Sequence, residues 1–419
     1  MENINVYPKV LIIYISCINK KDQHGVSIRE WFADWPQDRL AQIYSGGEVG
    51  IEKFCGYHYK LGQNDRKFGN LFLKLKKSSL GQSSYSITLD TKLTKSINFG
   101  VWSLYKNKFS EWLINTGLWE LIFRPSLSKE MRKFIADFNP KIIYCQGYNL
   151  TFTTLPIMIH KKFNIPICFQ TGDDWVSSLY KNSPLSLAIR PIVKKKVKSL
   201  LSNSAVRLAN GDLMAAVYKE RYRMPFESVM MCDNLSRFRN AIPKRVVNDS
   251  TISIVFTGNL GRDRWVSLIE LCEAAKLLQI QNGFKIMITA FATSIPAKAI
   301  NNLQEKANLQ IFPGPTHEDL PSYLKGADIL YLPETFEKEL ANEIRLSIST
   351  KAHFYMMSEK PTLVYGSPIS GIINYASVEK WACIVQDQDL NKLTLALRML
   401  ITDHNYCCLL YTSPSPRDS

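Results

Sequence analysis

Short apolar runs rich in β-branched residues alternate with helical patterns along most of this 419-residue chain. Such runs predict strands at residues 10–15, 41–44, 141–145, 165–169, 206–209 and 228–231, and again at 252–256, 285–289, 309–312, 329–332, 362–365 and 383–385. Between two of the later runs, apolar residues recur at helical spacing, at Leu268, Leu271, Ala275 and Leu278. Regular alternation of this kind is typical of parallel sheets covered by helices on both faces, and here it occurs twice. We expect an α/β protein with two Rossmann-like domains.

The length of the chain also favours two domains, because one hydrophobic core rarely supports so many residues. A polar stretch around Pro243 separates the two series of strands. We expect an N-terminal domain at 1–235, a linker at 236–250 and a C-terminal domain at 251–406. Segment 407–419 loses all periodicity and resembles translated cloning sequence, so we expect a non-native tail after a truncated second domain.

Composition limits the class of protein and its partners. Hydrophobic residues make up 46% and charged residues 21%, as in ordinary globular proteins. No apolar run approaches the roughly 20 residues that span a bilayer, no secretory signal is visible, and the nine cysteines form no CxxC pair, so we expect a cytoplasmic protein. The net charge of +15 calls for an anionic partner. Phosphorylated substrates or an anionic membrane fit better than nucleic acid, whose recognition motifs are missing.

A glycine turn follows the strand predicted at 252–256 and opens the next helix, in the order Phe-Thr-Gly-Asn-Leu-Gly-Arg-Asp-Arg at 256–264. Glycine allows a phosphate to approach the backbone, and amides at a helix N-terminus attract it. Arg262 and Arg264 would oppose the helix dipole there unless an anion neutralised them. The pattern predicts a phosphate site, and the alternative is a plain turn with solvated arginines.

A second pattern of this kind begins at Ser349. Thr350 can cap a short helix, and Lys351 in its first turn is again unfavourable without an anion. Lys-Pro at 360–361 then stops the helix, and the strand at 362–365 ends at Gly366 and Ser367. Ligands of open α/β sheets bind outside such strand ends.

These patterns together resemble the donor domain of the family-four, group-one glycosyltransferases, which are GT-B enzymes. Gly-Asn-Leu-Gly at 258–261, Ser-Thr-Lys at 349–351 and Lys-Pro, strand and Tyr-Gly at 360–366 carry the resemblance. In the first half, residues 25–32, with Trp-Pro at 35–36 and the segment 40–44, are similar to the acceptor-side loop and helix, so the likeness covers nearly the whole chain. It implies two parallel-sheet domains facing a central cleft, retention of configuration, and no metal or other cofactor.

By that resemblance, the donor site comprises Gly258, Asn259, Arg262, Arg264, Thr350, Lys351, Gly366 and Ser367, and the acceptor site includes Gly25 and Ser27. Many family members carry two glutamates eight positions apart. Phe354 occupies the place of the second glutamate here. Glu334, Glu337 and Glu343 lie upstream, and we take Glu337 as the candidate contact to the donor.

Three residues of the first half are candidates for catalysis. Asp173 and Asp174 follow the strand predicted at 165–169, so their carboxylates could orient an acceptor hydroxyl or act as a base. Either could instead cap the helix that begins near Trp175. His24, beside Gly25, is the third candidate, with a merely solvated histidine as the alternative. The remaining histidines show no metal-ligand spacing, so we expect no metal site.

Residues 185–201 combine apolar residues with Arg190 and four lysines in a basic amphipathic pattern. This pattern predicts either an anionic membrane contact, peripheral to the inner membrane face, or an ordinary helix with solvated lysines.

Together these features predict a glycosyltransferase of the hexosyltransferase type. It would move a sugar from a nucleotide-diphosphate donor to a glycan or lipid-linked acceptor in polysaccharide or glycoconjugate biosynthesis. Two alternatives stay open, namely a nucleotide-sugar 2-epimerase of the same fold and a non-catalytic subunit that binds a nucleotide sugar or glycan.

Overall fold

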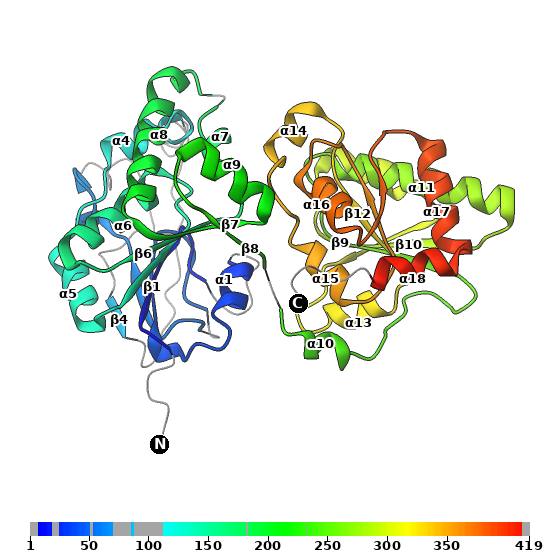
Figure 1. Cartoon of the computed structure of the whole chain (residues 1–419), viewed down its shortest axis with the longest axis horizontal. Coiled ribbons are helices and arrows are strands. Elements are labelled where there is room, and N and C mark those ends of the chain that lie inside the picture. The colour runs from blue at the N-terminus through cyan, green and yellow to red at the C-terminus, as the bar shows by residue number, and fades with distance from the viewer. Residues whose placement is uncertain are drawn as a thin grey trace, which may run out of the picture. The chain divides into compact units, whose positions relative to one another are not determined.

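The computed structural model describes residues 7–18, 25–50, 53–69, 85–87, 112–181, 183–231 and 233–412. The chain divides into two compact units, Met1–Met230 and Met231–Ser419 (Figure 1). The division falls before the stretch 236–250 that we expected as a linker. That stretch includes part of helix α10 and is fastened to the second unit by Arg245, which donates hydrogen bonds of 2.8 and 2.9 Å to Asp328.

The first unit is built on an eight-stranded sheet of order β4-β3-β2-β1-β5-β6-β7-β8. All its described pairings are parallel except that of β3 with β4. Its strands are β1 Val10–Ile13, β2 Leu40–Tyr44, β3 Tyr57–Lys60, β4 Tyr85–Ile87, β5 Ile142–Cys145, β6 Ile167–Thr171, β7 Ser204–Asn210 and β8 Glu227–Val229.

Helices pack on both faces of this sheet. The α-helices described are α1 Val26–Trp31, α4 Leu118–Ile122, α5 Lys129–Phe138, α6 Leu150–Phe163, α7 Trp175–Ser178, α8 Ser186–Ser202 and α9 Asp212–Tyr222, with 3₁₀ turns η1 Gln37–Arg39 and η2 Gln63–Asp65. In β1, Leu11 and Ile13 belong to the core under α5, α6 and α8, whereas Val10 and Ile12 pack with Ile28 of α1. Burial on both faces explains the uninterrupted apolar run of this strand.

The second unit holds a six-stranded sheet of order β11-β10-β9-β12-β13-β14, whose described pairings are all parallel. The strands are β9 Ile252–Asn259, β10 Ile286–Ser294, β11 Leu309–Pro313, β12 Ile329–Pro333, β13 Thr362–Tyr365 and β14 Cys383–Val385. The helices are α10 Leu235–Arg239, α11 Arg264–Asn282, α12 Ile300–Gln304, α13 Leu320–Lys325, α14 Lys338–Glu343, α15 Lys351–Met357, α16 Gly371–Glu379, α17 Leu390–Thr402 and α18 His404–Thr412, with the 3₁₀ turn η3 Ala297–Ala299.

Each strand expected from the sequence overlaps a strand of the structure, whereas β3 and β4 were not expected. The polar His58 in β3 is buried, and its Nε2 lies 2.7 Å from the Cys55 carbonyl oxygen. This hydrogen bond allows a polar residue at a buried strand position, so β3 does not show the apolar run by which the other strands were predicted. The segment that we expected to be a non-native tail, 407–419, begins within a helix. Helix α18 extends to Thr412 and buries Cys407 in the second core, while 413–419 lie outside the described residues.

Both sheets reverse their strand order once, between β1 and β5 and between β9 and β12. Strands β9 and β12 pair only at Ile254↔Ile329 and Val255↔Leu330. Further along, the Tyr355 hydroxyl lies between them. It accepts a hydrogen bond of 3.0 Å from the Thr257 amide and donates one of 3.3 Å to the Tyr331 carbonyl oxygen. Because Tyr355 belongs to α15, this buried side chain fixes that helix beside the reversal point.

Within the described part of the chain, no helix has the length and apolar character needed to cross a membrane.

Replacing Tyr355 with Phe should destabilise the second unit by about 1–3 kcal/mol, because the Thr257 amide and the Tyr331 carbonyl would lose a buried partner. Denaturant unfolding measures the change. Tyr57→Phe is the matched control, since no hydrogen bond is described for the Tyr57 hydroxyl. Equal stabilities of the two variants would contradict the proposed bridging role.

Candidate functional site

Lys351 and Gly258 lie together at the reversal point of the second sheet. Gly258 is near the end of β9 with a φ of 123°, and a Cβ atom placed on it would come within 2.9 Å of Lys351 Cε. The Lys351 ammonium lies 5.1 Å from the ring centre of Phe256. Glycine is therefore required at 258 so that the lysine side chain can cross the strand end, which is where ligands of open α/β sheets bind.

The Lys351 ammonium group is poorly hydrated. Burial, and secondarily the charge of Arg264, lower its pKa to about 7, and Glu334 opposes this shift. No ion pair with Lys351 is described among the residues of the structure. A cation in this state gains more from a bound anion than a solvated lysine would, because binding restores favourable interactions lost on burial.

Arg264, at the start of α11, is held by Glu334. Its Nε donates to Oε2 at 2.8 Å and its second guanidinium nitrogen to Oε1 at 3.2 Å, and the side chains are 14% and 3% exposed. The Ser267 hydroxyl donates to the Glu334 carbonyl oxygen at 2.8 Å. Glu334 follows β12 and was only a secondary candidate in the sequence, which gives no signal for an ion pair across 70 positions.

Gly366 and Ser367 follow β13 on the same side of the sheet. A Cβ atom on Gly366 would lie 2.7 Å from Glu334 Cβ, so glycine permits the close approach of these two strand ends. The Glu334 amide donates to the Tyr365 carbonyl oxygen at 2.7 Å. Ser367 is buried and its carbonyl oxygen accepts from the Ser370 hydroxyl. Both residues therefore shape the backbone around Glu334.

The turn between β9 and α11 contains two residues with left-handed backbone, Arg262 at φ 53° and Asp263 at φ 54°. Arg262 is exposed, and Asp263 accepts from Lys298 at 2.8 Å instead of capping α11. The exposed Asn259 accepts from the Gly261 amide. The amides of Leu260, Gly261, Arg264 and Trp265 all have acceptors within the chain, so side chains rather than these amides are available to an anion.

Glu337 and Thr350 have roles at helix ends. The carboxylate of Glu337 accepts from the amides of Glu339 and Leu340 and so caps α14, which lowers its pKa. Thr350 occupies the N-cap position of α15, but its side chain makes no capping hydrogen bond, contrary to the sequence expectation. Glu337 is exposed, and a donor contact through it would compete with its capping of α14.

Phe354 stands where the resembling family carries a glutamate, and here it is part of an aromatic cluster. Its ring stacks on Phe238 with centroids 6.1 Å apart and lies beside His317 and His353. Burial is the main cause that lowers the His353 pKa to about 4. This position therefore contributes packing of α15 rather than a carboxylate.

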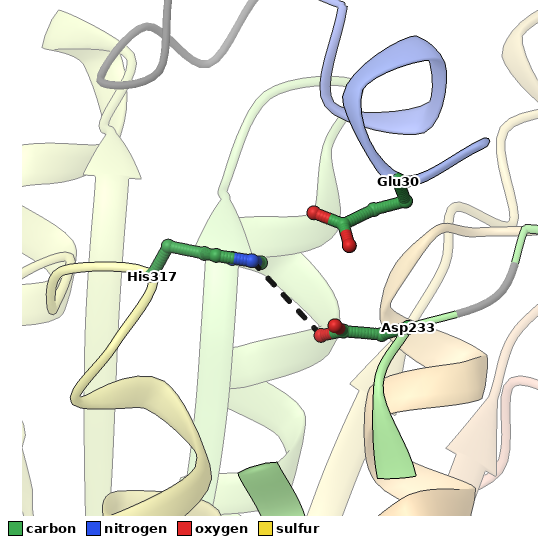
Figure 2. A group of neighbouring side chains, drawn as sticks. All are labelled: Glu30, Asp233 and His317. Carbon is green, nitrogen blue, oxygen red and sulfur yellow. Dashed lines mark ion pairs between the residues drawn. The ribbon is translucent and has the colours of Figure 1, made fainter. Parts of the chain in front are cut away.

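Asp233 and His317 also belong to the second unit, and Figure 2 shows them facing each other with 4.0 Å between Asp233 Oδ2 and His317 Nε2. Arg237 donates to the Asp233 carboxylate and to the His317 carbonyl oxygen. Because a guanidinium already neutralises the carboxylate, these residues form an ion-pair cluster. This cluster does not bear on the donor site, for which the expected absence of a metal stays a prediction.

In the first unit, Asp174 is fully engaged in hydrogen bonds. Arg221 donates to both of its oxygens at 2.6 and 2.8 Å, and Tyr218 and Ser177 donate at 2.9 and 2.7 Å. Although burial alone would raise its pKa, these donors hold the pKa below the usual value. Asp174 is at the N-cap of α7 without capping it. The geometry favours a structural role over that of a base.

Asp173 is exposed, and its charge contributes to the raised pKa values of Tyr14 and Tyr148. Gly25 precedes α1 with a φ of 72°, which only glycine adopts easily, and a Cβ atom there would lie 2.9 Å from Ile18. Ser27 is in the first turn of α1. His24 lies outside the described residues. The catalytic and acceptor roles of these residues stay predictions.

No protein-family model and no curated sequence matches the chain. Several solved structures are similar. Sucrose-phosphate synthase from Thermosynechococcus elongatus is 13% identical with a TM-score of 0.58, covering 96% of this chain and 92% of that one. WaaG, a glycosyltransferase involved in lipopolysaccharide biosynthesis, is 10% identical with a TM-score of 0.53, covering 96% and 93%. A putative UDP-N-acetylglucosamine 2-epimerase from Listeria monocytogenes is 8% identical with a TM-score of 0.52, covering 98% and 92%.

At such low identities the likeness shows the fold. With the two sheets described above, it establishes an α/β protein of the GT-B fold, composed of two Rossmann-like domains. A glycosyltransferase and an epimerase are both similar to this chain, so the fold alone leaves the reaction open.

Replacing Lys351 with Met should raise the melting temperature of the ligand-free protein near pH 7. The unfolded chain holds a proton on this lysine up to about pH 10.5, whereas the folded protein releases it near pH 7. The unfolded state therefore binds more protons in that window, and this group adds stability as pH rises from 7 to 10.5. The difference in melting temperature between Lys351→Met and the wild-type protein should therefore shrink as pH rises from 7 to 10.5. Thermal unfolding between pH 6 and 10.5 measures this difference.

The control is Lys276→Met, on the exposed part of α11. Parallel stability profiles for Lys351→Met and the wild-type protein, with no convergence toward pH 10.5, would show that Lys351 is ordinarily hydrated.

Proposed function

We propose that this protein is a glycosyltransferase that takes a sugar from a nucleotide-diphosphate donor bound to its second unit. The observation that carries the proposal is the Lys351 ammonium, held without a described ion-pair partner over Gly258 at the reversal point of the sheet. A diphosphate is the anion that we assign to this position, because its charge suits Lys351 and the exposed Arg262 belongs to the turn that follows the same strand.

The reaction breaks the bond between the anomeric carbon and the diphosphate oxygen and forms a bond from that carbon to an acceptor hydroxyl oxygen. Negative charge develops on the leaving diphosphate, and Lys351, Arg262 and Arg264 are the groups that stabilise it, in place of a metal. The hydroxyl proton passes to a base, for which we propose Asp173 because its carboxylate is exposed, whereas Asp174 is buried in an ion pair with Arg221. On the family resemblance, we propose retention of configuration.

The remaining donor contacts are assigned by position. Gly258 and Asn259 adjoin the diphosphate, and Gly366 and Ser367 approach the nucleoside at the end of β13. A glycan or lipid-linked acceptor binds the first unit, with polysaccharide or glycoconjugate biosynthesis as the setting.

A nucleotide-sugar 2-epimerase is the second candidate, favoured by the similarity to the Listeria monocytogenes structure. The two functions differ in their products. An epimerase converts the donor into its 2-epimer without any acceptor, whereas a transferase leaves the sugar configuration at C2 unchanged.

One or more of the common UDP-, GDP- and dTDP-sugars should raise the melting temperature of the wild-type protein and release nucleotide on turnover. Lys351→Met should weaken the binding of that donor by roughly ten- to a hundredfold, since hydrogen bonds to charged groups contribute about 1.5–3 kcal/mol. Arg262→Gly, which relieves the left-handed backbone at φ 53°, should weaken it less. Affinity should also fall as pH rises above 7, because Lys351 must be charged to bind the anion.

The control for this experiment is Lys276→Met, which should bind the donor as the wild-type protein does. A folded wild-type protein that no nucleotide sugar stabilises would refute the donor site. Donor binding that Lys351→Met leaves unchanged would place the diphosphate elsewhere.

We also propose that helix α8 contacts an anionic membrane surface (Figure 1). Its exposed part is apolar in the first half, where Leu187 is 92% and Ile192 is 37% exposed. Its second half is basic, with the exposed residues Lys194, Lys195, Lys196 and Lys198 and no acidic residue. Anionic lipid binds a helix of this kind when its apolar side chains lie at the bilayer boundary and its lysines lie at the level of the headgroups.

A variant carrying Lys194→Glu, Lys195→Glu and Lys198→Glu should lose binding to phosphatidylglycerol vesicles, by about a hundredfold or more, since each surface lysine contributes about 1 kcal/mol. Vesicle co-sedimentation measures this at low salt, with neutral phosphatidylcholine vesicles in parallel. The control variant, Lys129→Glu, Lys219→Glu and Lys276→Glu, changes net charge equally at other exposed positions. Equal losses in both variants would attribute binding to net charge rather than to α8.

A further inference from the structure

Aromatic residues gather at the reversal point of the first sheet. Tyr14 follows β1, Tyr148 follows β5, and Asp173 and Trp175 follow β6, so all come from the carboxyl ends of three neighbouring strands. None of the tyrosines or Trp175 was a candidate in the sequence. Ligands of open α/β sheets bind in the crevice beside such a reversal.

The three rings form a continuous row. The Tyr14 and Tyr148 ring centroids are 6.2 Å apart at an angle of 80°, and those of Tyr148 and Trp175 are 6.0 Å apart at 38°. Tyr14 and Tyr148 are half-buried, whereas Trp175 is 6% exposed. Tyr148 thus rests on a buried indole, Tyr14 packs against Tyr148, and both tyrosines keep part of their surface toward solvent.

Tyr148 has a strained backbone conformation. Its φ is 70° and that of the preceding Gly147 is 84°, so two successive residues have left-handed backbone. For a bulky aromatic residue this conformation costs about 1–3 kcal/mol. Gly147 is required because a Cβ atom there would lie 2.7 Å from Trp175 Cζ2. Packing of the Tyr148 ring against the core of the first unit offsets part of this strain, and the rest of the ring keeps surface toward solvent.

Polar groups accompany the rings. Asp173 is close to these phenols in the chain fold, since a Cβ atom placed on the adjacent Gly172 would lie 3.9 Å from the Tyr148 hydroxyl oxygen. Burial first, and then the charge of this exposed carboxylate, raise the pKa values of Tyr14 and Tyr148. Among the described residues, Trp175 Nε1 is buried without a hydrogen-bond partner. No hydrogen bond is described for the Tyr14 or Tyr148 hydroxyl either. The cluster therefore offers two hydroxyls, a carboxylate and aromatic faces to a ligand.

This combination suits a sugar ring. The C–H face of a pyranose packs on an aromatic ring, while its hydroxyls exchange hydrogen bonds with phenols and a carboxylate. A phosphate would be repelled by Asp173, and a purely apolar chain would leave the polar groups unpaired. We propose that Tyr14 and Tyr148, supported by Trp175, bind a sugar ring of the acceptor, and that Asp173 accepts a hydrogen bond from one of its hydroxyls. The inference rests on the proposed transferase function and specifies its acceptor as a glycan.

The test uses Tyr148→Gly in the full chain. Glycine adopts the left-handed backbone without strain, which offsets part of the packing lost with the ring, so the variant should fold with a lower melting temperature than the wild-type protein. Binding to an array of immobilised mono- and oligosaccharides should fall at least tenfold for the glycans that the wild-type protein binds. Stabilisation by the nucleotide sugar, measured separately, should not change.

Two further variants complete the experiment. Arg223→Gly relieves another left-handed residue of the same unit, at φ 55°, and should bind glycans as the wild-type protein does. Tyr14→Leu removes the second ring at a residue without such strain and should also lose glycan binding, which keeps the test decisive if Tyr148→Gly fails to fold.

Wild-type glycan binding that both tyrosine variants retain would overturn the proposal. So would a wild-type protein that binds no glycan on the array although nucleotide sugars stabilise it, and in that case the proposed donor function would stand. Loss of the nucleotide-sugar effect in the wild-type protein is a separate result, which would refute the donor function itself.

Discussion

The Tyr355 hydroxyl joins two strands that have stopped pairing with each other. Beyond Leu330, strands β9 and β12 diverge, and this phenol satisfies the Thr257 amide on one side and the Tyr331 carbonyl oxygen on the other. The same residue anchors α15, whose first residue is Lys351. The lysine is therefore positioned by neutral, buried hydrogen bonds four residues away, and its own charge is not needed to hold it. This is why it can remain available to a ligand.

One rule of α/β topology locates both candidate sites, but the side chains at the two reversal points differ. In the second unit, Lys351 and Arg264 lie beside Glu334, an arrangement with excess positive charge that suits an anion. In the first unit, Tyr14 and Tyr148 lie beside a carboxylate, which suits a neutral ligand with many hydroxyls. A nucleotide sugar and a glycan differ in just this respect. The chemistry of each crevice therefore supports the assignment of donor to one unit and acceptor to the other.

The sequence predicted the strands well because most of them are buried on both faces and read as apolar runs, as in Val10–Ile13. It also singled out Gly258, Arg264 and Lys351 through a local pattern of strand, turn and helix, and the structure brings these three residues together. It named Glu334 only as one of three upstream glutamates and did not predict its ion pair with Arg264, 70 positions away. It also left Asp173 and Asp174 as equal candidates. The partners of Asp174 are Tyr218 and Arg221, brought to it from 44 and 47 positions away by packing of α9. Local sequence patterns predict backbone geometry. The protonation state of a carboxylate depends instead on hydrogen-bond and ion-pair partners that come together only in the folded chain.

The same reasoning explains why the residues that matter most at both sites are locally unfavourable. A lysine with a pKa lowered to about 7 and a tyrosine with a φ of 70° each reduce the stability of the folded chain. Methionine could fill the first position without the charge, whereas the tyrosine also packs against the core of the first unit. Structural residues such as Tyr355 and Asp174 show the opposite pattern, because all their polar atoms have partners within the chain. A charge without a described partner and a strained backbone at the two reversal points are therefore the features on which we propose ligand-binding roles for Lys351 and Tyr148.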